Sequence, residues 1–182
     1  GQLYSEDPYR DNLPLWKGKP VVKALCLHVS HDCNLRCKYC FASTGDFGRQ
    51  RSIMSPEVGK KAIDFLLRES GSRRNLEVDF FGGEPLLNFN TVKEIVEYAL
   101  SKQKEYNKNF RFTITTNAVL LNEEHKKFIN EHMGNVVLSI DGRPEVNDRM
   151  RCRIDGTGTY KDIISKIKDM AESRNQTNYY VR

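Results

Sequence analysis

The stretch ALCLHVSHDCNLRCKYC, residues 24–40, sets the architecture of this chain. Its first half alternates, with apolar Leu25, Leu27 and Val29 separated by smaller or polar residues. A period of two is typical of a strand with one buried face. Its second half places three cysteines within eight residues, directly after that strand. The stretch therefore predicts a strand whose carboxyl end carries a group of thiols.

The rest of the chain continues as strands and helices in alternation. A helix is predicted to begin after Ser55, because serine caps helix N-termini and Pro56 suits the first helical position. Another is predicted to begin at Asn122 and to stop at Gly134, because glycine commonly ends helices. The predicted strands cover residues 24–29, 76–81, 110–115, 136–140 and 179–181, and the predicted helices cover 55–71, 90–107, 122–133 and 160–173. Four strand–helix units in a row predict a parallel sheet with right-handed crossovers.

The strands share an uneven distribution of side chains. In four of them one alternate set is apolar and suits packing against helices, whereas the other set is largely polar, as with Cys26, His28 and Ser30. Parallel strands that are covered on both sides are usually apolar on both faces. We therefore predict an α/β fold, a barrel whose concave side holds a polar cofactor. A sheet with one solvent-exposed face is the alternative.

The composition excludes several classes of protein. With 182 residues, of which 38% are hydrophobic and 29% charged, the chain is a globular domain and not a disordered tail. It has no apolar run of the roughly 18 residues that a membrane helix needs, and residues 1–7 lack the features of a signal peptide. Five cysteines, an odd number, argue against a secreted disulfide scaffold, so we expect a reducing, cytoplasmic location. The net charge of +5 is interpreted as an ordinary solvated surface. An acidic peptide or a nucleic acid as partner is the alternative, although a nucleic-acid surface is normally denser in basic residues.

Cys33, Cys37 and Cys40 have the spacing C-x3-C-x2-C in the loop after the first strand. A structural zinc site takes four protein ligands, and an electron-transfer iron–sulfur cluster is also held by four cysteines. The two remaining cysteines, Cys26 and Cys152, are isolated in the sequence. Three thiolates would leave one iron of a [4Fe–4S] cluster without a protein ligand, and a small molecule can bind there. A zinc site or a disulfide cluster is the alternative.

A second motif, made by Gly82, Gly83, Glu84 and Pro85, follows the second strand. Together with the cysteine motif, which has an aromatic residue before its last cysteine, it resembles the radical S-adenosylmethionine (SAM) enzymes. The resemblance covers residues 24–182 and implies a partial (β/α)6 barrel that binds a [4Fe–4S] cluster and SAM. It also implies that this second motif binds the amino group of SAM. Glycines let the backbone approach closely, and a carboxylate can accept hydrogen bonds from an ammonium group.

The same resemblance implies ligands for the SAM carboxylate. Ser139, on the polar face of the fourth strand, and Arg151 look like the serine and arginine that maturase-type members use on this group. A guanidinium suits bidentate binding of a carboxylate. Arg151 is chosen over Arg149 and Arg153 because of its spacing from Asp148.

The adenosine part of SAM has weaker signals in the sequence. The resemblance places Tyr39 against the adenine, with an aromatic anchor of the loop as the alternative. It places Asn117 near the ribose, although Ala118 stands where the family usually has glycine. Cleavage of SAM itself needs no general acid or base, so no catalytic side chain is assigned.

Four longer segments, residues 23–41, 79–86, 139–142 and 156–160, narrow the resemblance to radical SAM peptide maturases of the SPASM type. They are most similar to the maturases that form thioether cross-links in precursor peptides with six cysteines in forty-five residues (SCIFF). This implies an enzyme that uses a 5′-deoxyadenosyl radical from SAM to join a cysteine sulfur to a carbon of the peptide. It also implies two partners: a cysteine-rich precursor peptide with its leader, and an electron donor such as ferredoxin or flavodoxin.

The expected domain organisation is a lead-in over residues 1–22, interrupted by three prolines, and a radical SAM core over residues 23–182. Such maturases also carry a C-terminal domain with auxiliary iron–sulfur clusters. We expect that domain to be absent here, because only two cysteines lie outside the motif. Two other functions stay open: a sulfatase-type maturase that makes formylglycine, and a non-catalytic iron–sulfur electron-transfer protein.

Overall fold

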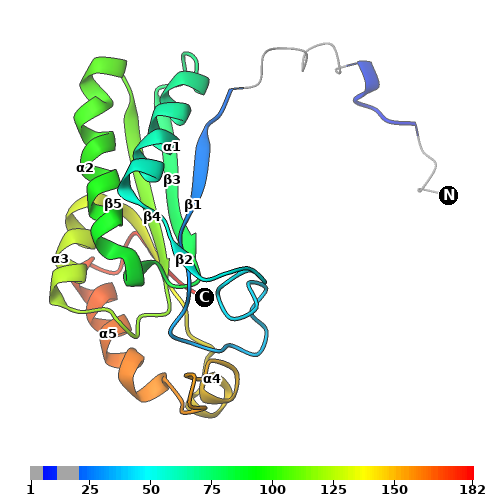
Figure 1. Cartoon of the computed structure of the whole chain (residues 1–182), viewed down its shortest axis with the longest axis vertical. Helices are drawn as coiled ribbons and strands as arrows, with labels where there is room; N and C mark the ends of the chain where they lie inside the picture. Colours follow the sequence, from blue (N-terminus) through cyan, green and yellow to red (C-terminus); the bar gives the residue numbers. More distant parts are fainter. Residues whose placement is uncertain (1–5, 12–20) are drawn as a thin grey trace.

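The computed structural model describes residues 6–11 and 21–182, so most of the predicted lead-in over residues 1–22 lies outside the described residues. A six-stranded sheet with the order β2-β1-β3-β4-β5-β6 forms the framework (Figure 1). The strands are β1 (Ala24–His31), β2 (Ser52–Ile53), β3 (Asn75–Gly82), β4 (Asn109–Thr116), β5 (Met133–Leu138) and β6 (Tyr179–Val181). β2 runs antiparallel to β1, and every other neighbouring pair is parallel. The predicted α/β fold with a mainly parallel sheet, part of a barrel, is confirmed.

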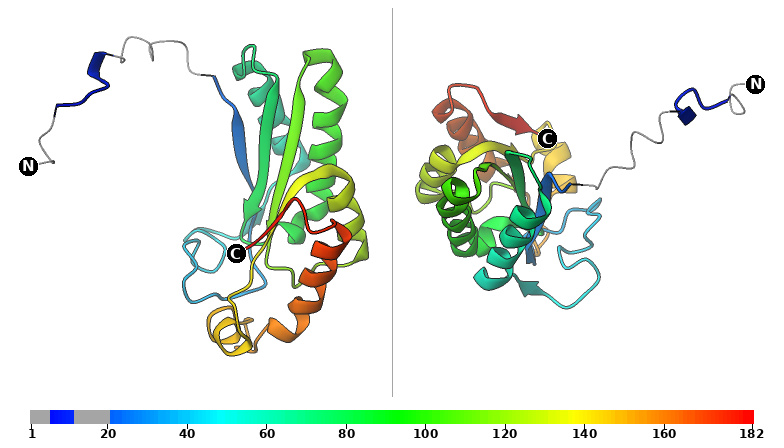
Figure 2. Two further views of the ribbon diagram at one scale, coloured as in Figure 1. Left: turned by 180° about the vertical axis from the view of Figure 1, so that it is seen from behind. Right: turned by 90° about the horizontal axis from the view of Figure 1, so that it is seen from above.

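Helices lie along one face of the sheet and leave the other face open (Figure 2). The long ones are α1 (Pro56–Glu69), α2 (Phe89–Tyr106), α3 (Glu123–His132) and α5 (Tyr160–Ser173). Two of their starts follow the predicted capping. The Ser55 hydroxyl accepts a hydrogen bond from the Val58 amide at 3.4 Å, and the Asn122 side chain accepts one from the His125 amide at 2.9 Å. The capping residues in the sequence therefore set where these helices begin.

The predicted stop at Gly134 is wrong. Helix α3 ends at His132, and β5 begins at the next residue, so Gly134 lies inside the strand. A side chain at this position would meet the side chain of Arg111, whose Cγ would lie 2.7 Å from the added carbon. The glycine therefore provides space beside a neighbouring strand and does not end a helix.

Three short elements were absent from the sequence prediction. They are β2, the 3₁₀ helix η3 (Pro85–Asn88) and α4 (Pro144–Met150). Each is too short to show a hydrophobic period of its own. Two of them matter for the site, because η3 begins at the last residue of the second sequence motif and α4 ends directly before Arg151.

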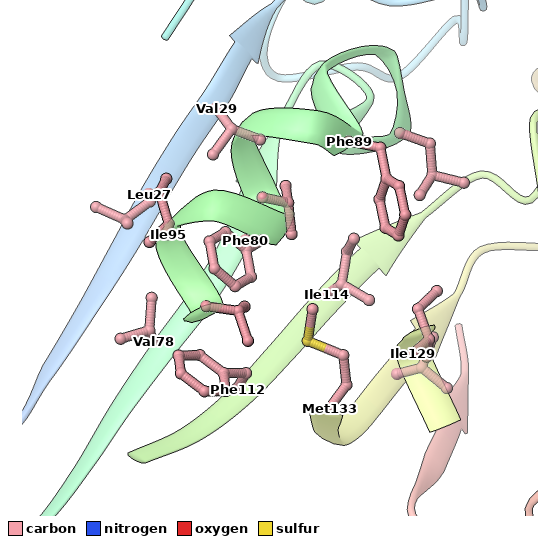
Figure 3. Packing of buried hydrophobic residues seen from close by; sticks show 14 of the residues in the cluster. Leu27, Val29, Val78, Phe80, Phe89, Ile95, Phe112, Ile114, Ile129 and Met133 are labelled. Carbon is pink, nitrogen blue, oxygen red and sulfur yellow. The ribbon is translucent and has the colours of Figure 1, made fainter. Parts of the chain in front are cut away.

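The core lies between the sheet and the helices (Figure 3). Its sheet side is formed by the predicted apolar sets, with Val29, Val78 and Phe80 completely buried. Side chains of the opposite set, such as Asp79 and Arg111, remain exposed on the open face. Within residues 6–11 and 21–182, no helix has the length and apolar character needed to cross a bilayer.

Candidate active site at the carboxyl edge of the sheet

A cavity of about 300 Å³ lies where the parallel strands end. Such edges are where α/β proteins usually bind ligands. Ten of the eleven predicted site residues line it: Cys33, Cys37, Tyr39, Cys40, Gly82, Gly83, Glu84, Asn117, Ser139 and Arg151. The exception is Pro85, which is buried and opens η3. Residues from the ends of three strands and from two loops thus meet at one place.

The three motif cysteines face this cavity as free thiols. Burial raises the pKa of the Cys33 thiol to about 12, and burial also raises the pKa of Cys37. Both thiols are therefore protonated at neutral pH in the metal-free protein, and any metal that binds them as thiolates must displace their protons. In the described part of the chain, no three His, Cys, Asp or Glu side chains lie close enough to bind one metal ion.

Backbone hydrogen bonds join the cysteine loop to the end of α4 and the residues that follow it. The Arg36 amide donates to the Cys152 carbonyl at 2.7 Å, and the Lys38 amide donates to the Met150 carbonyl at 2.9 Å. These two bonds flank Arg151, which lies between the two acceptor residues. The pairing therefore places Arg151 beside the cysteines although more than a hundred residues separate them in the chain.

The turn after β3 closes against the start of the cysteine loop. The Gly83 amide donates to the Ser30 carbonyl at 2.7 Å, and the Glu84 amide donates to the Asp32 carbonyl at 2.9 Å. Gly82 has a φ of +132°, which favours glycine, and a side chain there would collide with the Ser30 carbonyl oxygen. The two glycines are thus required because two backbone segments lie in direct contact.

Glu84 is 1% exposed and already binds three protein donors. Its Oε1 accepts from the Leu86 amide at 3.0 Å and the Thr116 hydroxyl at 2.8 Å, and its Oε2 accepts from the Asn117 amide at 2.8 Å. Burial raises the pKa of Glu84, and the amide hydrogen bonds oppose this. An ionised carboxylate has about four acceptor positions, so one remains for a ligand. Glu84 therefore joins the ends of β3 and β4, a role that the sequence motif did not reveal.

Asn117 is 5% exposed and serves as a link between elements. Its Nδ2 donates to the Asn34 side chain at 2.8 Å, and its Oδ1 accepts from the Val119 amide at 3.0 Å. The sequence missed Asn34, whose side chain joins the cysteine loop to the end of β4. The next residue, Ala118, is buried with a φ of +63°, in the left-handed region where the resemblance led us to expect glycine.

Substitutions at Ala118 test this backbone conformation. We expect Ala118→Gly to change the free energy of unfolding by less than about 1 kcal/mol, because relief of the left-handed strain offsets the lost methyl burial and the greater chain entropy. Ala118→Val is expected to lower it by about 2–4 kcal/mol, because a β-branched side chain is strained at this φ and overfills the site. Urea denaturation measures both values. Equal costs for the two variants would contradict this account.

Tyr39, Asp141 and Arg151 form a hydrogen-bonded group at the cavity wall. The Arg151 Nη1 donates to the Tyr39 hydroxyl at 2.7 Å, and that hydroxyl donates to the Asp141 Oδ1 at 2.8 Å. Ser139, which follows β5, lines the same cavity and donates its amide to the Thr116 carbonyl at 3.0 Å. Asp141 was not among the predicted site residues, although its alternation with Ser139 placed it on the open face of the sheet.

Comparisons with known proteins agree on the family and the fold. A profile of the Radical SAM superfamily matches residues 27–181. The chain is 27% identical over 165 residues to the radical SAM cyclopropyl synthase TigE of Paramaledivibacter caminithermalis, which covers 85% of this chain and 34% of that protein. It is 32% identical over 159 residues to a cysteine-type anaerobic sulfatase-maturating enzyme of Clostridium perfringens, which covers 84% of this chain and 40% of that enzyme.

Solved structures share the fold. The structure of anSMEcpe with bound AdoMet and the Cp18Cys peptide superposes with a TM-score of 0.74 at 24% identity, over 89% of this chain and 42% of that one. This chain therefore spans less than half the length of each of these three relatives.

Proposed function

Since this chain belongs to the radical SAM superfamily, whose enzymes use a [4Fe–4S] cluster and SAM, we propose that it is the cofactor-binding core of a peptide-modifying maturase. The modification we propose is a thioether cross-link between a cysteine sulfur and a carbon of a ribosomally made, cysteine-rich precursor peptide. The proposed partners are that peptide with its leader and an electron donor such as ferredoxin or flavodoxin. The proposed extent of the core is residues 23–182.

The observation that carries the cofactor proposal is the convergence of three free thiols on one cavity. Cys33, Cys37 and Cys40 would hold the cluster and leave one of its irons to SAM. When bound, this pair of cofactors supplies a one-electron cleavage of SAM that gives methionine and a 5′-deoxyadenosyl radical, which abstracts a hydrogen atom from the substrate. The protein contributes orientation and exclusion of water.

The cavity offers groups of the right charge for the two ends of the SAM zwitterion. The free acceptor position of Glu84 and the backbone at Gly82 and Gly83 suit the ammonium group, with Pro85 fixing the start of η3 behind them. The Arg151 guanidinium and the Ser139 hydroxyl suit the carboxylate. Tyr39 is proposed to lie against the adenine and Asn117 near the ribose.

The thioether assignment is supported by the four longer sequence segments that resemble peptide maturases. A second candidate is formylglycine formation in a sulfatase. It is supported by the 32% identity to a cysteine-type anaerobic sulfatase-maturating enzyme. Both candidates use the same site residues. They differ in the peptide substrate and in the reaction that the substrate radical undergoes.

The test uses the full-length enzyme, reconstituted with iron and sulfide without oxygen and supplied with a reductant and SAM. We expect 5′-deoxyadenosine to form, and its absence would contradict a catalytic function in favour of electron transfer. With a cysteine-rich precursor peptide, we expect a product that has lost two hydrogen atoms and one thiol that iodoacetamide can label. A product aldehyde that reacts with a hydrazide would instead support formylglycine formation.

A further inference from the structure

Arg151 has a buried hydrogen-bond donor without a protein partner. The residue is 8% exposed, and its Nε has no acceptor among residues 6–11 and 21–182. Leaving such a donor unpaired costs free energy, so a buried unpaired guanidinium edge beside a cavity points to an anionic ligand. The opposite side of the guanidinium is already occupied, because Nη1 donates to the Tyr39 hydroxyl at 2.7 Å.

The hydrogen bonds from Arg151 to Asp141 can run in only one direction. A guanidinium has only donors and a carboxylate has only acceptors, so the Tyr39 hydroxyl must accept from Arg151 and donate to Asp141. The distance from Nη1 to the Asp141 Oδ1 is 3.8 Å, too long for a direct hydrogen bond. The tyrosine hydroxyl therefore links the two side chains, so the position of the Asp141 carboxylate constrains the position of the Arg151 guanidinium.

Asp141 is itself held in place by α4, the helix that ends directly before Arg151. Its amide donates to the side-chain oxygen of Asn147 at 3.2 Å, and Asn147 is completely buried. The carbonyl of the same asparagine accepts from the Arg151 amide at 2.6 Å. Asp141 and Arg151 are thus both fixed to one residue of α4, which closes the hydrogen-bonded group.

We propose that Asp141 is a positioning residue for the carboxylate of SAM, acting on Arg151 through the hydroxyl of Tyr39. This inference rests on the proposed function. Asp141 holds the Nη1 edge of the guanidinium, so that the opposite edge is turned toward the incoming carboxylate without a further loss of side-chain freedom. Tyr39 therefore has two roles: its ring suits the adenine, and its hydroxyl orients the arginine.

Binding to two nucleosides tests the proposal in the cluster-loaded full-length protein. S-adenosylhomocysteine carries the carboxylate, and 5′-methylthioadenosine lacks the amino acid part. We expect Asp141→Ala and Tyr39→Phe each to weaken the binding of S-adenosylhomocysteine by about three- to tenfold, the range that one immobilised side chain accounts for. Neither should change the affinity for 5′-methylthioadenosine by more than about twofold. Asp141→Asn keeps an acceptor for the tyrosine hydroxyl and is expected to restore most of the affinity.

The double variant provides the second measurement. Since both substitutions interrupt the same chain of hydrogen bonds, Tyr39→Phe with Asp141→Ala should bind S-adenosylhomocysteine no more weakly than the weaker single variant. Equal losses for both nucleosides, additive losses, or full affinity in Asp141→Ala would overturn the proposal. Iron content and thermal unfolding of each variant show whether the cluster and the fold are retained. A wild-type protein that binds neither nucleoside would overturn the proposed function as well, whereas the other outcomes leave that function intact.

Discussion

Replacing Cys37 with alanine is expected to remove the iron–sulfur cluster completely. Reconstituted wild-type protein should hold about four irons per chain and show broad visible absorbance, whereas the Cys37→Ala protein should hold less than about one and be colourless. The physical reason is that two thiolates cannot retain a cluster that already has one iron without a protein ligand. Iron analysis and the visible spectrum measure the result, and both are independent of enzyme activity.

A matched control is available in the same chain. Cys26→Ala also removes one thiol, but Cys26 is exposed on β1 and does not line the cavity. We expect this variant to retain the iron content and spectrum of the wild type. An unchanged spectrum in Cys37→Ala, or the same loss in both variants, would show that the three motif cysteines do not hold the cluster.

The sheet was predictable because its strands carry strong local signals. Alternation in segments such as Leu25, Leu27 and Val29 needs no knowledge of the rest of the molecule, and in the structure Leu27 and Val29 are buried and Leu25 is partly buried against the same core. Boundaries were less predictable. β1 extends to His31 because it pairs with β2, and β5 begins at Met133 because it pairs with β4. Pairing partners are distant in sequence, so local patterns do not contain this information.

The site was predictable where it depends on strand ends and not where it depends on long-range contacts. Motifs at the ends of β1 and β3 had to meet, because parallel strands bring their carboxyl ends to one edge. The contact between Tyr39 and Asp141 spans 102 positions and depends on α4, which the sequence did not reveal. Likewise, the three protein donors of Glu84 come from η3 and the end of β4. A sequence motif identifies a site residue, but it does not show which protein groups already form hydrogen bonds with that residue.

Replacing Gly83 with alanine is expected to damage both stability and cofactor binding. The φ of Gly83 is negative, so alanine is not disfavoured by the backbone conformation itself. The added methyl group would instead collide with the carbonyl group of Asp32, and it would lie 3.0 Å from the carbonyl oxygen of Gly45. Backbone atoms cannot turn away as a flexible side chain can, so one of the two segments must move. We expect the free energy of unfolding to fall by about 2–4 kcal/mol, measured by urea denaturation of the metal-free protein.

The same collision explains why binding should fail together with stability. Asp32 directly precedes the first cysteine of the motif, and its carbonyl accepts the hydrogen bond from the Glu84 amide. Moving it displaces a proposed cluster ligand and the proposed ammonium site at once, so iron content and S-adenosylhomocysteine affinity should each fall at least about tenfold. Gly134→Ala is the matched control, because the atoms nearest to its methyl group would belong to the exposed side chain of Arg111, at the other end of the sheet, and not to backbone. That variant should lose less than about 1 kcal/mol and keep its iron. If Gly83→Ala behaved like Gly134→Ala, the close backbone contact between the two motifs would not be what holds the site together.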